Sequence, residues 1–270
     1  MTKAELRPID LFSMYMQVAG VPTLEDEPGD DPALRGKKLG VVNGATWITL
    51  WSNYWGRRLL PGVKLINVGN EGVQLNFMDA HAKGEPCPPQ INIDLFAQYA
   101  QDLVHLYGVD AVLVSCSTMN RAIGAVREAM ARHDVPVVQI DEPMMEAAVR
   151  TGGRILVVAT HGPTVKSTQA LLRETAEQLG KEVSFSGATV EEAFDRLGEG
   201  DVEGHNELIA AAIRRKCAEE DISVVVLAQL SMTVFKLSHP DCVDEFGVPV
   251  LTSGEEGFKR CGEVLRGLEG

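Results

Sequence analysis

The sequence predicts an α/β fold of two duplicated lobes, each built on a parallel sheet of the flavodoxin-like kind. Short apolar runs rich in Val, Leu and Ile alternate with helical patterns along most of the chain, which is the order expected of strand–helix–strand units. The second observation is an internal repeat. AVLVSCSTMN at 111–120 aligns with VVVLAQLSMT at 224–233, and VPVV at 135–138 aligns with VPVL at 248–251, both with an offset of 113 residues. We therefore expect two pseudo-symmetric lobes with an active site in the cleft between them.

The repeat reaches the first strand of each half at a slightly different spacing. VVN at 41–43 matches VVA at 157–159 with an offset of 116 residues, so a short insertion separates the two alignments. The chain divides into three expected parts: an N-terminal extension at 1–36, a first lobe at 37–145 plus 246–270, and a second lobe at 146–245. The extension contains an amphipathic segment at 9–18, which we interpret as a packing or dimer arm.

Apolar β-branched runs predict the strands, and apolar side chains at helical spacing predict the helices. In the first lobe we expect strands at 38–43, 63–68, 111–115 and 135–140, with helices after Asn43, at 72–81, 92–107 and 119–133, and from Asp141. In the second lobe we expect strands at 154–159, 181–185 and 222–228, and helices at 164–179, 190–197 and 202–220. The C-terminal part, assigned to the first lobe, is expected to add a strand at 248–251 and a helix at 255–268. The helix after Asn43 carries Trp47, Trp51 and Trp55 on one stripe, which is typical of a core or a subunit interface.

Composition excludes several classes of function. The net charge of −13 and the absence of a Lys/Arg cluster argue against a nucleic-acid partner. No run of 18 apolar residues occurs, so we expect no membrane partner, and five Cys without a CxxC motif predict reduced thiols in the cytoplasm. No phosphate-binding glycine motif is present, and His81 and Cys87 lack further ligands for zinc. We therefore expect neither a cofactor nor a metal.

Cys116 is the candidate reactive residue. It follows the buried strand at 111–115, and a helical pattern begins at about Met119. In open α/β sheets ligands bind at the carboxyl ends of the strands, and the free N–H groups of a helix N-terminus favour an anion there. The same positive end lowers the pKa of a thiol from its ordinary value of about 8.5. The sequence therefore predicts an activated thiol beside an anion-binding turn.

Five segments in order carry a resemblance to a known family. They are the first strand ending at Asn43, DAVLVSCSTMN around Cys116, VPVVQIDEP, ILVVATHGPTVKS, and the strand ending at Gln229. From about Lys38 to the C-terminus the chain resembles the aspartate/glutamate racemase superfamily, which includes amino-acid and hydantoin racemases, maleate isomerase and arylmalonate decarboxylase. The resemblance implies two pseudo-symmetric lobes, no cofactor, and a bound substrate carboxylate. In the racemases of this group, a Cys from each lobe flanks the α-carbon.

The resemblance also implies roles for single residues. Cys116 matches the first-lobe catalytic Cys, and the other candidates for substrate binding are Asn43, Ser117, Thr118, Thr160, Gln229 and Ser231. Gln229 stands where a two-Cys racemase has its second Cys, and the internal repeat identifies the same position. An amide forms hydrogen bonds but has no accessible pKa, so it cannot serve as a general acid or base. His161 is then the candidate for a second proton carrier.

These observations predict a cofactor-independent isomerase or racemase-like enzyme with one reactive thiol. We expect proton transfer at the carbon next to a carboxylate or carbonyl of a small substrate. Alternatives on the same scaffold are a decarboxylase, a lyase and a Cys-dependent hydrolase, and a further alternative is a non-catalytic carboxylate-binding protein. The expected partners are a small carboxylate or related substrate and further copies of the chain, as a homodimer or higher homo-oligomer.

Overall fold

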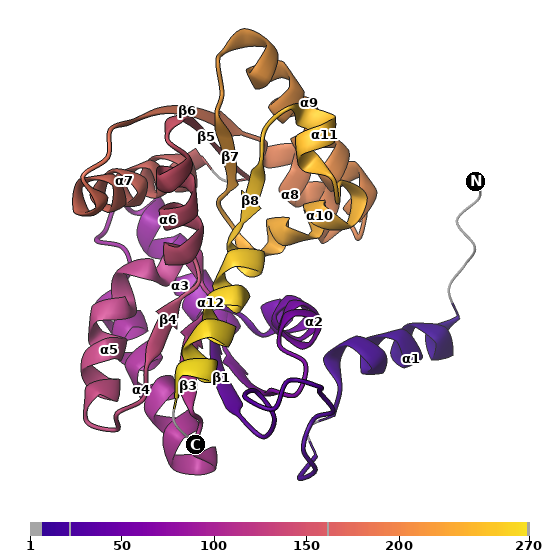
Figure 1. Cartoon of the computed structure of the whole chain (residues 1–270), viewed down its shortest axis with the longest axis vertical. Coiled ribbons are helices and arrows are strands. Elements are labelled where there is room, and N and C mark those ends of the chain that lie inside the picture. The colour runs from indigo at the N-terminus through magenta and orange to yellow at the C-terminus, as the bar shows by residue number, and fades with distance from the viewer. Residues whose placement is uncertain (1–6, 22, 161, 269–270) are drawn as a thin grey trace. The chain divides into compact units, whose positions relative to one another are not determined.

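The computed structural model describes residues 7–21, 23–160 and 162–268, and the side chains of residues 162 and 163 lie outside that description. It contains two four-stranded sheets, with helices between successive strands (Figure 1). This architecture confirms the predicted α/β fold class. The strand order of each sheet begins as in flavodoxin-like proteins, in which the second strand lies outside the first and the third follows on its other side.

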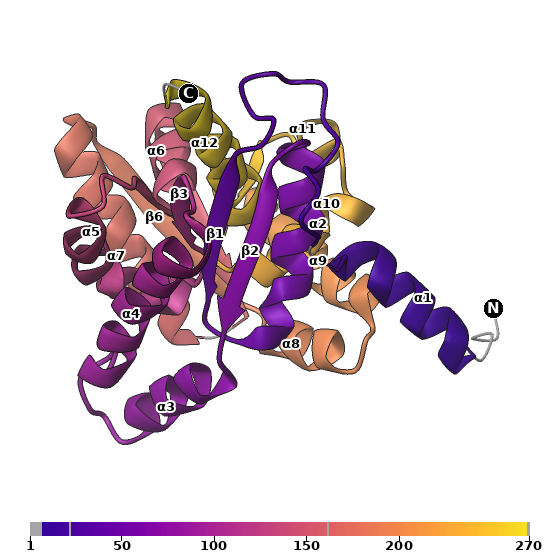
Figure 2. The same cartoon turned by 90° about the horizontal axis from the view of Figure 1, so that it is seen from below.

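The first sheet has the order β2-β1-β3-β4, and β1 pairs in parallel with both β2 and β3. Helix α2 packs on β2, and helix α4 packs on β1 (Figure 2). The elements of this part of the chain are α1 (Pro8–Ala19), β1 (Lys38–Asn43), the 3₁₀ turn η1 (Thr46–Ile48), α2 (Thr49–Leu59), β2 (Lys64–Gly69), α3 (Glu71–Ala82), α4 (Gln90–Tyr107), β3 (Ala111–Val114), the 3₁₀ turn η2 (Ser117–Ala122), α5 (Ile123–Ala131), β4 (Val137–Gln139) and α6 (Glu142–Thr151).

The second sheet has the order β6-β5-β7-β8, and its three strand pairs are all parallel. Its elements are β5 (Gly153–Ala159), α7 (Gly162–Leu179), β6 (Val183–Thr189), α8 (Glu191–Gly198), α9 (Val202–Glu219), β7 (Val224–Leu227), the 3₁₀ turn η3 (Leu230–Val234), α10 (Phe235–Ser238), α11 (Cys242–Phe246), β8 (Val250–Thr252) and α12 (Ser253–Gly267). The sequence predicted no helix between β7 and β8, so η3, α10 and α11 are additions to the expected pattern.

The register of the two sheets confirms the internal repeat. Leu39 of β1 pairs with Ala111 of β3, and Ile155 of β5 pairs with Val224 of β7. The first members of these pairs are related by the offset of 116 residues and the second members by the offset of 113. The two halves of the chain therefore share strand order and strand register, as expected of a duplication.

The division of the chain differs from the predicted boundaries. Two compact units are found: unit 1 comprises Met1–Ser115, Arg121–Val137 and Cys261–Gly270, and unit 2 comprises Cys116–Asn120 and Val138–Arg260. The sequence assigned 246–270 to the first lobe, but β8 pairs with β7 in the second sheet. The strand therefore draws the residues up to Arg260 into unit 2. Cys116 and the four residues after it also belong to unit 2.

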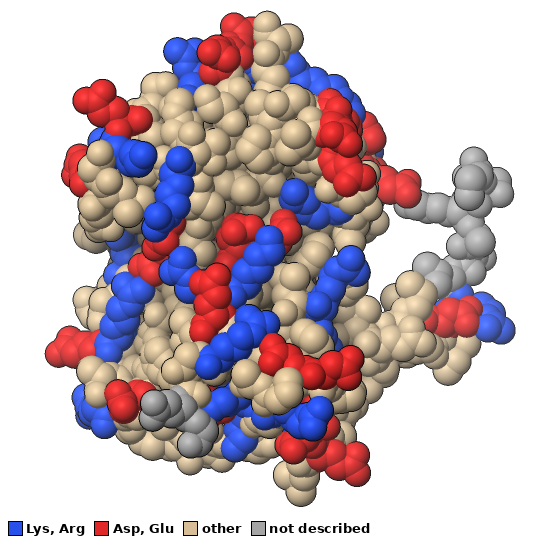
Figure 3. All heavy atoms as spheres, in the orientation of Figure 1, with Lys and Arg blue, Asp and Glu red and all other residues tan. Residues whose placement is uncertain are grey.

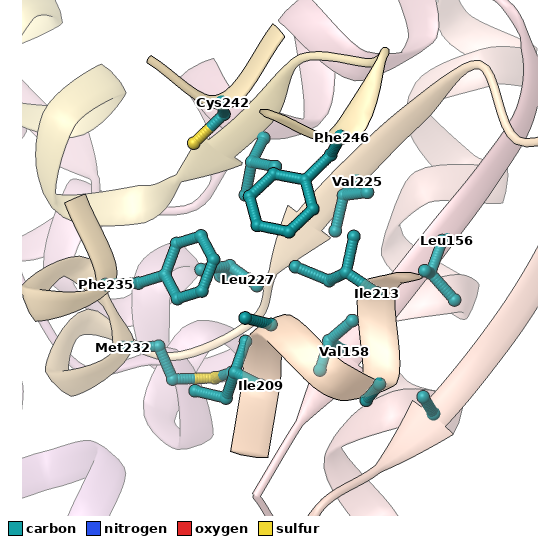
Figure 4. Close-up of a cluster of buried hydrophobic side chains, with 14 of the residues drawn as sticks. Leu156, Val158, Ile209, Ile213, Val225, Leu227, Met232, Phe235, Cys242 and Phe246 are labelled. Atoms are coloured by element: carbon teal, nitrogen blue, oxygen red, sulfur yellow. The ribbon is translucent and has the colours of Figure 1, made fainter. Parts of the chain in front are cut away.

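The core of unit 2 covers both faces of its sheet. Because successive side chains of a strand point to opposite faces, Leu156 and Val158 of β5 enter one apolar cluster, whereas Ile155 and Val157 enter another. The first cluster is shown in Figure 4, where Phe235 projects among side chains from the strands and from α9 and α11. Burial on both faces explains why β7 is apolar throughout and why β5 is apolar from Ile155 to Ala159.

The predicted N-terminal helix is present as α1, and no residue of it is buried. It packs against α2 of unit 1, where Asn53 Nδ2 donates a hydrogen bond to Ala19 O at 2.9 Å. Its exposed large apolar side chains reach 64% exposure at Ile9 and 66% at Phe12. The Trp residues of the predicted stripe differ in exposure: Trp55 is buried and Trp47 is exposed.

Charged side chains of both signs lie next to one another on the face shown in Figure 3. The chain as a whole carries a net charge of −13 at pH 7. Among the described helices, none is long and apolar enough to cross a membrane.

Candidate active site

Cys116 lies directly after β3, at the turn that begins η2. Its Sγ is 3.2 Å from Thr118 Oγ1, and its carbonyl oxygen accepts a hydrogen bond from Met119 N at 3.1 Å. The residue as a whole is half-buried. The predicted position of the thiol at the end of a strand is therefore confirmed.

The predicted direction of the thiol pKa is wrong. Burial raises the pKa of Cys116, and the negative charge of Asp141 raises it further. Hydrogen bonds from the Thr118 hydroxyl and from the backbone N–H groups of Thr118 and Met119 lower it, but by less. The turn after Cys116 is a 3₁₀ turn with a non-helical residue at Met119, so its peptide dipoles are less well aligned than those of an α-helix. Cys116 is a neutral thiol at neutral pH.

Ser117 contacts an acid that the sequence analysis did not single out. Ser117 Oγ donates a hydrogen bond to Asp141 Oδ1 at 2.8 Å, and Gln139 Nε2 donates to Asp141 Oδ2 at 2.8 Å. Asp141 is only 2% exposed, and burial raises its pKa to about 6. Neighbouring strands end at the same edge of a sheet, so the position of Asp141 after β4 was a usable signal. Its burial and its contact with Ser117 could not be read from the sequence.

Gln229 forms a fixed pair with Thr160. Gln229 Oε1 accepts hydrogen bonds from Thr160 N at 2.8 Å and from Thr160 Oγ1 at 2.9 Å. These two donors identify the oxygen end of the amide, so Nε2 is its donor end. Gln229 also repeats the backbone turn of Cys116, because its carbonyl oxygen accepts from Met232 N at 3.0 Å. The structural equivalence of Cys116 and Gln229 is therefore confirmed.

Asn43 belongs to a separate network in unit 1. It is fully buried, and its Oδ1 accepts hydrogen bonds from Ser52 Oγ at 2.7 Å and Ser115 Oγ at 2.6 Å. Its Nδ2 donates to Asn67 Oδ1 at 3.0 Å and to Val68 O at 3.2 Å. The amide is thus saturated by its own unit, and its evident role is to fix the end of β3 just before Cys116.

The remaining candidates fall in different environments. Thr118 is exposed, whereas Ser231 in η3 is buried. His161, the predicted second proton carrier, lies outside the described residues. Within the described part of the chain, no group of three or more His, Cys, Asp or Glu side chains could hold a metal ion.

Comparison with known proteins identifies the family. The family model described as Asp/Glu/Hydantoin racemase matches residues 82–261, which is more than half of the chain. The chain belongs to the Asp/Glu/hydantoin racemase family. No curated protein matches the sequence. As a family member it is an isomerase- or racemase-like enzyme, and the matched residues include both Cys116 and Gln229.

Solved structures of other racemases share the fold. An aspartate racemase homologue from Pyrococcus horikoshii is 17% identical, with 85% of this chain and 99% of that chain covered and a TM-score of 0.63. Glutamate racemase from Bacillus anthracis is 17% identical, with 86% and 82% covered and a TM-score of 0.60. Allantoin racemase from Klebsiella pneumoniae is 18% identical, with 85% and 88% covered and a TM-score of 0.57. At these identities the likeness concerns the fold.

The buried carboxyl of Asp141 makes the stability of this racemase-family chain depend on pH. Its pKa of about 6 in the folded chain lies above the ordinary value of 3.8, so the folded state binds this proton more tightly than the unfolded state. The stabilisation by the neutral carboxyl is full below about pH 4 and is lost as the pH rises through 6. We expect Asp141→Asn to raise the free energy of unfolding at pH 8 by up to about 3 kcal/mol, with little effect at pH 4. Urea unfolding at the two pH values measures this, and an equal effect at both would contradict it.

Proposed function

We propose that the chain is a cofactor-independent enzyme that transfers a proton at the carbon next to a carboxylate, with Cys116 as its single reactive thiol. The observation that carries the proposal is the equivalence of Cys116 and Gln229 in the two repeats, since both carbonyls accept from the residue three positions later. A two-thiol racemase needs a proton-exchanging group at both positions, and an amide cannot supply one. Proton transfer by Cys116 at one face of the substrate is therefore the function that these residues support best.

Each of the two equivalent strand ends carries a hydrogen-bond donor. The Thr118 hydroxyl lies 3.2 Å from Cys116 Sγ, and Gln229 has Nε2 as its donor end because Thr160 holds its carbonyl end. Such donors stabilise an enediolate oxygen when they are fixed before the reaction begins. Loss of one such donor typically lowers the rate by about 10²–10³-fold.

The raised pKa of Cys116 favours decarboxylation as a second candidate function. A neutral thiol is ready to give its proton to the enediolate that remains after loss of CO₂, whereas proton removal requires the thiolate first. The two reactions differ in their dependence on pH. Protonation of an enediolate by the thiol slows as the pH rises through the pKa of Cys116, and abstraction by the thiolate accelerates.

Solvent exchange tests the proposed proton transfer. The protein is incubated in D₂O with a panel of small carboxylates, hydantoins and malonates, and deuterium at the carbon next to the carboxylate is followed by NMR. We expect catalysed exchange, or CO₂ release with deuterium incorporation, for one class of the panel. A protein that binds a member of the panel but neither exchanges its proton nor releases CO₂ would contradict the proposal.

We also propose that the chain forms a homodimer through α1. Monomeric proteins seldom leave a large apolar patch exposed, and a second copy presents the same helix in a self-complementary contact. The apolar side chains of α1 that are at least 46% exposed are Ile9, Leu11, Phe12, Met14, Tyr15 and Met16.

Light scattering tests this assembly. We expect twice the chain mass for the full chain and the single mass for Phe12→Asp. The control is Leu106→Asp, which changes a side chain of α4 that is 83% exposed and should leave the mass unchanged. A monomeric full chain, or a dimeric Phe12→Asp variant, would contradict the proposed interface.

A further inference from the structure

Asp141 is a buried carboxyl whose two oxygens have different partners. Oδ2 accepts from Gln139 Nε2, and Oδ1 accepts from Ser117 Oγ, each at 2.8 Å. The orientation of the Gln139 amide is fixed, because its Oε1 accepts from the backbone N of Asp141 at 2.7 Å and of Glu142 at 2.8 Å. Gln139 can therefore only donate to the carboxyl. The hydroxyl of Ser117 can both donate and accept, so the Ser117 side is the side that can change with protonation.

The pair of Ser117 and Asp141 occurs in only one of the two repeats. At the offset of 113 residues, Ser117 corresponds to Leu230 and Asp141 to Gly254. A Cβ atom at Gly254 would lie 2.5 Å from Thr233 Oγ1 and 2.8 Å from Leu230 Cδ1, so that half has no room for an acid. The fold therefore forms this turn without a buried carboxyl, and the acid in the first repeat needs a separate explanation.

Among the described residues, the groups that favour the ionised form of Asp141 are neutral hydrogen-bond donors, Gln139, Ser117 and Ser253, and none is a cation. The titratable groups that act on Asp141 are Glu142, next in the chain, and the Cys116 thiol. Ser253 at the start of α12 is buried without a hydrogen-bond partner among the described residues, and it is near enough to favour the ionised form weakly.

We infer that Asp141 is a proton-linked positioning residue that acts through the hydroxyl of Ser117 on a substrate carboxylate. The inference rests on the proposed function, since it requires a carboxylate beside Ser117. When Asp141 is ionised, the Ser117 hydroxyl donates inward to Oδ1. When Asp141 takes up one proton, its O–H donates to Ser117 Oγ, and the Ser117 hydrogen is released to donate outward. Protonation also removes a buried negative charge that repels the substrate anion.

Carboxylate binding is then coupled to the uptake of one proton. The pKa of about 6 for Asp141 places the change within the range of an ordinary assay. Above that pH the competent fraction of the protein falls tenfold per pH unit, so the apparent Kd rises by about tenfold between pH 7 and pH 8. Asn at position 141 imitates the protonated acid, because its Oδ1 can accept from Gln139 while its Nδ2 donates to Ser117.

Calorimetric titration of the full chain with D- and L-glutamate, between pH 5.5 and 8.5 and in buffers of different ionisation enthalpy, tests the inference. We expect proton uptake by the wild type on binding to be a small fraction of a proton at pH 5.5 and to approach one proton above about pH 7, with an affinity that falls as the pH rises. Asp141→Asn should bind with an affinity that does not change over this range. Binding by both proteins with the same pH dependence, or without proton uptake, would overturn the inference and leave the proposed function intact. Absence of glutamate binding by both proteins at every pH would overturn the inference, whereas the proposed function is judged separately by the exchange panel.

A measurement without ligand tests the pairing itself. The carboxyl carbon of ¹³C-labelled aspartate is titrated by NMR, and Asp141→Asn assigns the signal. We expect Ser117→Ala to shift the titration midpoint of Asp141 upward, because the ionised form loses a hydrogen-bond donor. Thr118→Ala is the control, since Thr118 bonds to Cys116 rather than to Asp141. An unchanged midpoint in Ser117→Ala would show that Ser117 does not act on Asp141.

Discussion

Replacement of Cys116 by Ala is expected to lower the rate of α-carbon exchange by about 10²–10⁴-fold, the usual contribution of a positioned acid or base. The thiol lies at the end of β3, within reach of the Thr118 hydroxyl at 3.2 Å. Its removal leaves the hydrogen-bond donors of the site but no group that carries the proton. The rate of deuterium incorporation, measured at saturating substrate, gives the loss directly.

Cys217→Ala is the matched control for that experiment. Like Cys116, Cys217 is half-buried, belongs to unit 2 and has a thiol pKa that burial raises. It lies on α9 and packs against the apolar cluster rather than at a strand end. Its removal should change the exchange rate by less than a factor of 2, an order-of-magnitude expectation for a thiol without a catalytic role. Full activity of Cys116→Ala would rule out the proposed role of the thiol.

Phe235→Ala is expected to lower the free energy of unfolding by about 3–5 kcal/mol. Phe235 is fully buried in the cluster of Figure 4, where its ring stacks on His239 with centroids 4.5 Å apart and contacts Phe246 at 5.8 Å. Truncation to Ala leaves a cavity between α9, α10 and α11 that the surrounding helices cannot fill without moving. The free energy of unfolding in urea measures the effect.

Leu237→Ala provides the comparison for Phe235→Ala. Leu237 lies two residues further along the same short helix and is 52% exposed. The Leu237→Ala variant should lose no more than about 0.5 kcal/mol of its free energy of unfolding, as is usual for surface substitutions. Similar losses in the two variants would mean that the cluster does not organise this part of unit 2.

The strands of both sheets were predictable from the sequence, whereas the short helices α10 and α11 were not. The strand at 38–43 was predicted with its observed bounds, because a run of buried apolar residues ends at a polar Asn and a Gly. The third strands of both sheets are fully buried, so their apolar runs stood out and exposed the repeat. By contrast, α10 has four residues and α11 has five. Helices of one turn show too few apolar positions to reveal a period.

The position of the candidate site was predictable from the sequence, but the direction of the Cys116 pKa shift and the contact of Ser117 with Asp141 were not. The location of Cys116 followed from a strand that ends in a helical pattern, and the place of Gln229 followed from the repeat. The direction of the thiol pKa did not follow, because desolvation depends on which side chains cover the sulfur. The contact of Ser117 with Asp141 was hidden for the same reason. It joins residues 24 positions apart whose side-chain directions are set by the packed fold.

The configuration of the exchanged substrate tests the central claim most directly. A single enantiomer of the substrate that exchanges is incubated in D₂O with the full chain, and deuterium content and enantiomeric excess are followed together. A lone thiol with an amide at the equivalent position of the other repeat predicts deuterium incorporation with the original configuration kept. Loss of enantiomeric excess at the rate of deuterium incorporation would contradict it, because a second proton carrier would then have to supply the other face.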